Sequence, residues 1–125
     1  MKKKVLIVDD KSEFFPAINE TLKDYFDIIF VNSIHAAKKI IKNIELAAVI
    51  SDFNLAKGSG IDLLVYLFEE HPYIYRALMS GTDKKVIDQL TDKTEIVQHF
   101  LAKPLNILKI IELKDIILNQ PAYTG

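Results

Sequence analysis

The fold is decided by a pattern that first appears at Lys4-Val5-Leu6-Ile7-Val8-Asp9-Asp10, where a short apolar run stops at two aspartates. The same pattern returns at Ala47-Ala48-Val49-Ile50-Ser51-Asp52. Apolar runs of this length, without polar alternation, are typical of strands buried on both faces, as in a parallel sheet. Each stretch therefore predicts a buried strand with a carboxylate at its end.

Outward from these stretches, short apolar runs alternate with longer segments of helical spacing. The predicted strands are Lys4–Val8, Ile28–Val31, Ala47–Ser51, Ile74–Ser80 and Gln98–Ala102. The predicted helices begin after a Ser12 cap, after a Ser33 cap, near Gly60, at Lys84 and after Pro104. Five strands alternating with five helices predict an α/β fold, a doubly wound parallel sheet covered on both faces.

Size and composition favour one globular domain. The chain has 125 residues, of which half are hydrophobic and a quarter are charged, with a net charge of −1. We assign residues 1–120 to the domain and 121–125 to a tail or the start of a linker. Near-neutrality gives no electrostatic reason to expect nucleic acid or an anionic membrane as a direct partner.

Two further features of the sequence exclude some classes of chemistry and location. There is no cysteine, which excludes disulfides, thiolate catalysis and cysteine-ligated metals. The basic Lys2-Lys3-Lys4 precedes an apolar run that is too short for a signal-peptide core or a membrane span. We therefore expect a cytoplasmic protein.

Polar side chains follow four of the five predicted strands. Asp9 and Asp10 end the first strand, Asp52 the third, Ser80 the fourth and Lys103 the fifth. In open α/β sheets, functional sites lie outside the carboxyl ends of the strands. Each residue alone could be a helix cap, a turn or a surface side chain, but independent capping does not explain their joint position.

The charges of this cluster require a cation. Three carboxylates placed close together repel one another, and Lys103 supplies only one positive charge. Because every candidate ligand is an oxygen, Mg²⁺ or Mn²⁺ is the expected metal. A carboxylate beside a metal and a lysine suits phosphoryl transfer to form an aspartyl phosphate, with Ser80 bonding a phosphoryl oxygen. Spacing alone does not rank the three aspartates as nucleophile.

Four pieces of the chain together resemble the receiver domain of response regulators. They are Val5-Leu6-Ile7-Val8-Asp9-Asp10, Val49-Ile50-Ser51-Asp52-Phe53-Asn54, Leu78-Met79-Ser80-Gly81 and Phe100-Leu101-Ala102-Lys103-Pro104. The resemblance extends from about Lys3 to Leu118, and it implies a flavodoxin-like fold with strand order 2-1-3-4-5.

By this resemblance, Asp52 is the phosphoacceptor and Lys103 pairs with the phosphoryl group. The implied metal ligands are Asp10 directly, Asp9 largely through water, Asp52 itself and the backbone carbonyl of Asn54. The resemblance thus chooses one aspartate among three that spacing left equal.

The resemblance also implies a switch. Ser80 stands at the hydroxyl position expected to move toward the phosphoryl group, and Phe100 stands at the aromatic position expected to swing inward in response. Lys103-Pro104 is expected to be a cis peptide, which is accessible at low cost only before proline. Ser80 replaces a common Thr and Phe100 a common Tyr. Ala56 replaces a common Pro, so we expect a looser loop after Asp52.

The function implied is a phosphorylation-controlled switch that catalyses only its own Mg²⁺-dependent phosphorylation and dephosphorylation, and is no metabolic enzyme. The expected donor is a phosphohistidine on a sensor histidine kinase or a phosphotransfer protein. The expected target is an output domain or a protein partner. Apolar residues cover more than one face of the last helix, which predicts either a broad buried face or an exposed contact surface. Such a surface, on the fourth helix, last strand and last helix, would bind an output domain or form a homodimer.

Two other functions compete with the switch. A phosphohydrolase with an aspartate nucleophile requires an acid-base carboxylate two residues after it, where Asn54 cannot transfer a proton usefully. A receiver that docks independently of phosphorylation predicts missing site residues, and none is missing.

Overall fold

The computed structural model describes residues 2–11, 14–91 and 94–121, and its centre is a five-stranded parallel sheet. The strands are β1 (Lys3–Val8), β2 (Phe26–Val31), β3 (Ala48–Asp52), β6 (Tyr75–Ser80) and β7 (His99–Ala102). They lie in the order β2-β1-β3-β6-β7, which confirms the predicted flavodoxin-like order. Because the order reverses between β1 and β3, the carboxyl ends of these two strands mark a topological switch point.

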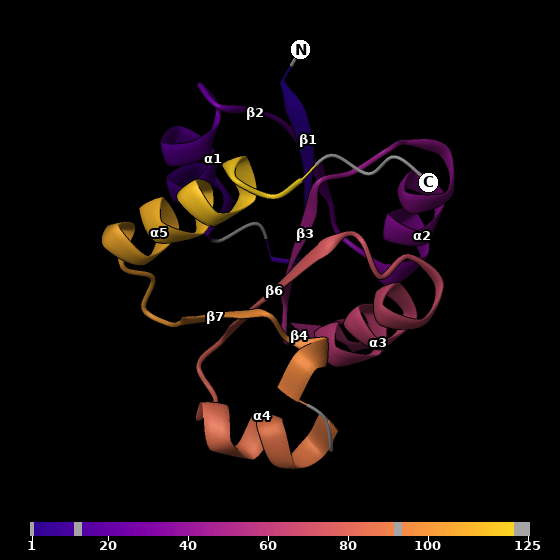
Figure 1. Cartoon of the computed structure of the whole chain (residues 1–125). Helices are drawn as coiled ribbons and strands as arrows, with labels where there is room; N and C mark the ends of the chain where they lie inside the picture. Colours follow the sequence, from indigo (N-terminus) through magenta and orange to yellow (C-terminus); the bar gives the residue numbers. More distant parts are fainter. Residues whose placement is uncertain (1, 12–13, 92–93, 122–125) are drawn as a thin grey trace.

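Helices cover both faces of this sheet (Figure 1). They are α1 (Phe15–Leu22), α2 (Ile34–Asn43), α3 (Gly60–Glu70), α4 (Lys84–Thr91) and α5 (Ile107–Leu118), with a 3₁₀ turn η1 (Thr94–Ile96). Figure 1 shows α1 and α5 on one face, and α2 and α3 on the other. Within the described residues, no helix has the length and apolar character to cross a membrane.

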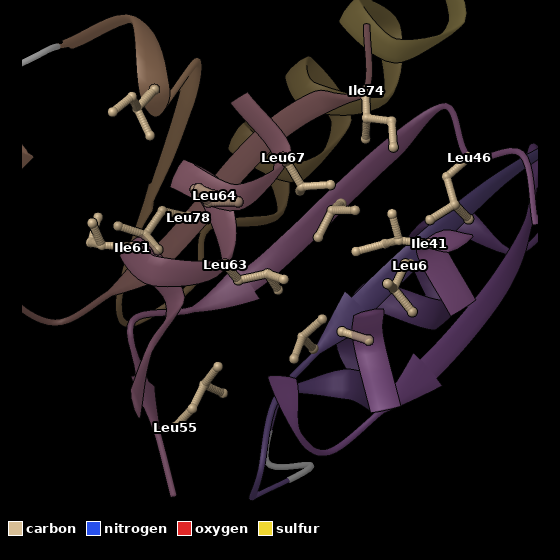
Figure 2. Close-up of a cluster of buried hydrophobic side chains, with 14 of the residues drawn as sticks. Leu6, Ile41, Leu46, Leu55, Ile61, Leu63, Leu64, Leu67, Ile74 and Leu78 are labelled. Carbon is tan, nitrogen blue, oxygen red and sulfur yellow. The ribbon is translucent and has the colours of Figure 1, made fainter. Parts of the chain in front are cut away.

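Alternate residues of β1 serve two separate cores, as the two-residue period of a strand requires. Leu6 and Val8 pack with residues of α2 and α3, in the cluster that Figure 2 draws. Val5 and Ile7 pack on the opposite face with residues of α1 and α5. All four side chains are fully buried, which explains why the strand reads as a continuous apolar run.

Side-chain caps define the starts of three helices. Ser33 Oγ accepts a hydrogen bond of 3.1 Å from the Ala36 N–H, which confirms the predicted cap of α2. Ser59 and Asp62 form a reciprocal capping box at α3, and Asn106 caps α5. The predicted Ser12 cap lies outside the described residues, and Phe14 occupies the N-cap position of α1.

The loop after Asp52 contains a short hairpin, and its looseness stays a prediction. β4 (Asn54–Leu55) and β5 (Gly58–Ser59) pair antiparallel, and Leu55 is buried. Gly58 has φ = 122°, a conformation that other residues rarely adopt. Glycine at this position therefore permits the turn between β4 and β5.

Candidate functional site

Strand register brings the predicted site residues to one edge of the sheet. Val8 is aligned with Ser51, so Asp9 follows β1 beside Asp52 at the end of β3. Ser80 is aligned with Ala102, and the Lys103 N–H donates to the Ser80 carbonyl at 3.0 Å. Parallel strands end at the same edge, so residues far apart in the chain become neighbours there.

Three carboxylates form the acidic part of the site. Asp9, Asp10 and Asp52 each place one carboxylate oxygen within 4.8 Å of the others. Asp9 and Asp52 are only 1% and 2% exposed, whereas Asp10 is half-buried. Burial raises the pKa of Asp9, the Lys11 N–H opposes this rise, and the charge of Asp52 adds to it. The site therefore holds negative charge at a position where water solvates it poorly.

Two carboxylate oxygens in this cluster fit a metal ligand set. Asp9 Oδ1 accepts a hydrogen bond of 3.0 Å from the Lys11 N–H. Asp9 Oδ2 and Asp10 Oδ1 are buried without a hydrogen-bond donor among the described residues. Buried acceptors without donors are costly unless a cation or ordered water satisfies them. An all-oxygen set of this kind suits Mg²⁺, and the structure places Asp9, Asp10 and Asp52 where they could hold it.

One ammonium group faces these carboxylates. Lys103 Nζ lies 2.9 Å from Asp52 Oδ1 and donates a hydrogen bond to it. The Lys103–Pro104 peptide is cis, as the resemblance implied. Three carboxylates against one ammonium leave two negative charges uncompensated by these side chains.

The backbone of Asp52 is held by contacts that sequence reasoning missed. The Phe53 N–H donates to the Met79 carbonyl and the Gly60 N–H to the Phe53 carbonyl, both at 2.8 Å. Ser51 Oγ donates to the Asp52 carbonyl at 3.0 Å. A Cβ at Gly60 would collide with that same carbonyl oxygen. The first turn of α3 thus packs directly on the strand end, and the only signal in the sequence was a glycine at a helix start.

Ser80, Phe100 and Asn54 occupy different surroundings. Ser80 is buried, and its Oγ accepts a hydrogen bond of 2.8 Å from the Thr82 N–H. Phe100 is half-buried in β7 against the α2–α3 core. Asn54 is exposed and pairs with Ser59 in the hairpin. The switching roles of Ser80 and Phe100, and metal binding by the Asn54 carbonyl, stay predictions.

Phe14 makes a contact with Lys103 that the sequence pattern does not indicate. Phe14 shares a helical spacing with Ile18 and Leu22, and it packs against the α1–α5 core. Its ring also faces Lys103 Nζ, which lies 4.6 Å from the ring centroid. Nothing in the local sequence indicates this contact with the site.

Sequence comparison matches the chain to one family model and to one curated protein. The sequence model of the response regulator receiver domain family matches residues 5–114. The hydrogenase transcriptional regulatory protein HoxA of Cupriavidus necator is 28% identical over 98 residues, covering 78% of this chain. The matched part of the chain spans 20% of the length of that relative.

Solved receiver domains share the fold. The signal receiver domain of an HD domain-containing protein from Pseudomonas fluorescens Pf-5 superposes with a TM-score of 0.83 at 22% identity, covering 94% of this chain and 95% of that one. A CheY-like receiver domain protein from Methanospirillum hungatei JF-1 gives a TM-score of 0.84 at 18% identity, with 96% and 97% covered. At these identities the likeness concerns the fold.

Proposed function

Because the chain belongs to the response regulator receiver domain family of two-component signalling, we propose that Asp52 accepts a phosphoryl group and that this modification switches the chain between two states. The proposed donor is a phosphohistidine on a sensor histidine kinase or a phosphotransfer protein. The observation that carries the proposal is the hydrogen bond of 2.9 Å between Lys103 Nζ and Asp52 Oδ1 within a cluster of three carboxylates.

The proposed transfer is an in-line substitution at phosphorus. A carboxylate oxygen of Asp52 forms the new O–P bond while the N–P bond of phosphohistidine breaks, and the imidazole nitrogen keeps the electron pair. Lys103 stabilises the negative charge that develops on the transferring group. Asp9, Asp10 and Asp52, with the Asn54 carbonyl, would hold Mg²⁺, which when bound neutralises phosphoryl and carboxylate oxygens.

Ser80 and Phe100 would carry the switch. Ser80 Oγ accepts from the Thr82 N–H, and a hydroxyl that accepts one bond can still donate its own proton, here to a phosphoryl oxygen on Asp52. Lys103 follows β7, the strand that carries Phe100, and its N–H is bonded to the Ser80 carbonyl. A shift of Ser80 therefore has a direct backbone route to the strand that carries Phe100.

The proposed output contact uses exposed apolar side chains on α4 and at the start of α5. These side chains are Val86, Leu90, Ile107 and Leu108. The candidate occupants are an output domain, a separate partner or a second copy of the chain. The likeness to a transcriptional regulator supports an output domain that acts on transcription.

Intact-mass analysis after incubation with a small phosphodonor and Mg²⁺ tests the proposal. We expect one phosphoryl adduct on the parent chain, none on Asp52→Asn, and an unchanged adduct on Asp27→Asn, which alters an exposed aspartate of β2. An adduct that persists in Asp52→Asn, or a parent chain that never forms one, would overturn the assignment of Asp52. Sustained turnover of a phosphomonoester would instead indicate a phosphohydrolase.

A further inference from the structure

We propose that Phe14 is a positioning residue for phosphoryl transfer, because its ring holds the Lys103 ammonium group at Asp52. The proposal rests on the proposed function of Asp52 and adds a residue outside the polar cluster. Phe14 contacts Lys103, and its proposed role requires no contact with a phosphoryl group. It acts through Lys103 alone.

Two contacts hold the Lys103 ammonium. Nζ lies 2.9 Å from Asp52 Oδ1 and 4.6 Å from the centroid of the Phe14 ring. The side chain of Lys103 is 23% exposed, so the ammonium lies where water is partly excluded. A cation over an aromatic face is attracted by the ring quadrupole, and the attraction strengthens as water leaves.

Lys103 needs support because its flexible stem has several rotatable bonds. Its bond to Asp52 changes during the reaction, since the carboxylate becomes an acyl phosphate and its charge moves to the phosphoryl oxygens. The contact with Phe14 does not depend on the state of Asp52. It therefore keeps the ammonium near the reacting atoms as the negative charge moves, which is the condition for preorganised stabilisation.

The position of Phe14 is fixed by the start of α1. The Phe14 carbonyl accepts a hydrogen bond of 3.2 Å from the Ile18 N–H, and α1 packs against α5. The neighbouring Phe15 has a different contact, since its ring lies 4.6 Å from that of Phe30. Both phenylalanines pack against the same apolar core, but the ring contact with Lys103 is made by Phe14. Phe15 is therefore a matched control.

Phosphorylation rates with a small phosphodonor and Mg²⁺ test the role of the ring. Phe14→Leu keeps an apolar side chain but removes the aromatic face, and we expect it to slow phosphorylation roughly three- to tenfold. Phe14→Tyr keeps the aromatic face and should restore the parent rate. Phe15→Leu should leave the rate unchanged, although it removes a ring from the same core.

A spectroscopic readout tests the contact itself. The methylene protons beside Lys103 Nζ should show a ring-current shift by NMR in the parent and in Phe14→Tyr, and lose it in Phe14→Leu. Equal slowing in Phe14→Leu and Phe15→Leu, or a retained shift in Phe14→Leu, would overturn the proposal by indicating a general packing effect. So would a Phe14→Leu rate equal to that of the parent.

The two proposals fail in distinguishable ways. A parent chain that is never phosphorylated overturns the proposed function and the role of Phe14 together. A parent chain that is phosphorylated on Asp52, with Phe14→Leu behaving identically, overturns only the role of Phe14.

Discussion

Lys103 Nζ lies 2.9 Å from Asp52 Oδ1, although the two residues are 51 positions apart in the chain. Asp52 is at the end of β3, and Lys103 follows β7, with β6 between these strands. The hydrogen bond from the Lys103 N–H to the Ser80 carbonyl defines the backbone from which this side chain extends. One cation is thereby delivered to a group of three carboxylates.

The uncompensated charge of the acidic cluster predicts stabilisation by Mg²⁺. At a Mg²⁺ concentration one hundred times the Kd, the free energy of unfolding of the parent chain should rise by about 2.7 kcal/mol. Asp9→Asn keeps the oxygen that accepts from the Lys11 N–H but removes a buried charge. Urea unfolding in EDTA should find this variant at least as stable as the parent, and Mg²⁺ should stabilise it much less. An equal Mg²⁺ effect in both chains would contradict the assigned ligand set.

The close approach of α3 to β3 predicts different outcomes for alanine substitutions at Gly60 and Gly81. Gly60→Ala places a methyl group against the Asp52 carbonyl oxygen and should reduce the free energy of unfolding by about 1–3 kcal/mol or more. Gly81→Ala meets nothing within 4 Å and should leave stability nearly unchanged. Chemical denaturation of both variants measures the difference. A Gly60→Ala chain as stable as Gly81→Ala would show that the helix start can move away without cost.

We expect a large loss of stability when the guanidinium of Arg76 is removed. This side chain is 3% exposed and donates to the backbone carbonyls of Pro72, Ile74, Glu95 and Ile96. Arg76→Met leaves these acceptors without their donor and should cost at least about 3 kcal/mol. Arg76→Lys should not restore the loss, because an ammonium lacks the planar fork that reaches several carbonyls. Thermal unfolding is the measurement, with Lys85→Met, at an exposed position, as the neutral control.

His99 predicts a pH dependence of stability. Burial lowers the pKa of His99 below its ordinary value of 6.5, with Glu112 opposing the shift. The unfolded chain therefore binds a proton at a higher pH than the folded chain. This contribution to stability is complete above pH 6.5 and is lost as the pH falls toward the folded pKa.

Urea unfolding of the parent chain and of His99→Gln across this range measures the contribution. The free energy of unfolding of the parent should fall relative to that of His99→Gln as the pH falls below 6.5. Identical pH profiles for the parent and His99→Gln would contradict the assignment.

A substitution among the exposed apolar side chains of α4 and α5 should weaken partner binding without changing the phosphorylation of Asp52. Leu90 and Leu108 are 62% and 70% exposed, so Leu108→Ser should change the free energy of unfolding by less than about 0.5 kcal/mol. Phosphorylation of Asp52 should be unchanged, whereas self-association or partner binding after phosphorylation should weaken. Sedimentation velocity on phosphorylated samples measures this, and Leu118→Ser at the other end of α5 is the control. Equal association in both variants would exclude the start of α5 from the contact.

Local patterns were sufficient to predict most secondary structure. The buried strands read as apolar runs because both faces of the sheet are covered, and the Ser33 cap was recognisable from its position. The ambiguous last helix was resolved only by packing, since Ile110, Leu113 and Ile117 face the core whereas Ile107 is exposed. The β4–β5 hairpin was missed because its two-residue strands are too short to show a period.

The sequence by itself determined that Asp9, Asp10, Asp52, Ser80 and Lys103 would meet at one edge of the sheet. This follows from the apolar runs and from the alternation of strands with helices, which predicts a parallel sheet whose strands end at one edge. Only the tertiary structure decided which atoms face one another. Phe14 against Lys103, Gly60 against the Asp52 carbonyl and Arg76 against four carbonyls are contacts between distant segments. They depend on strand register and helix packing, and a local sequence pattern indicates neither.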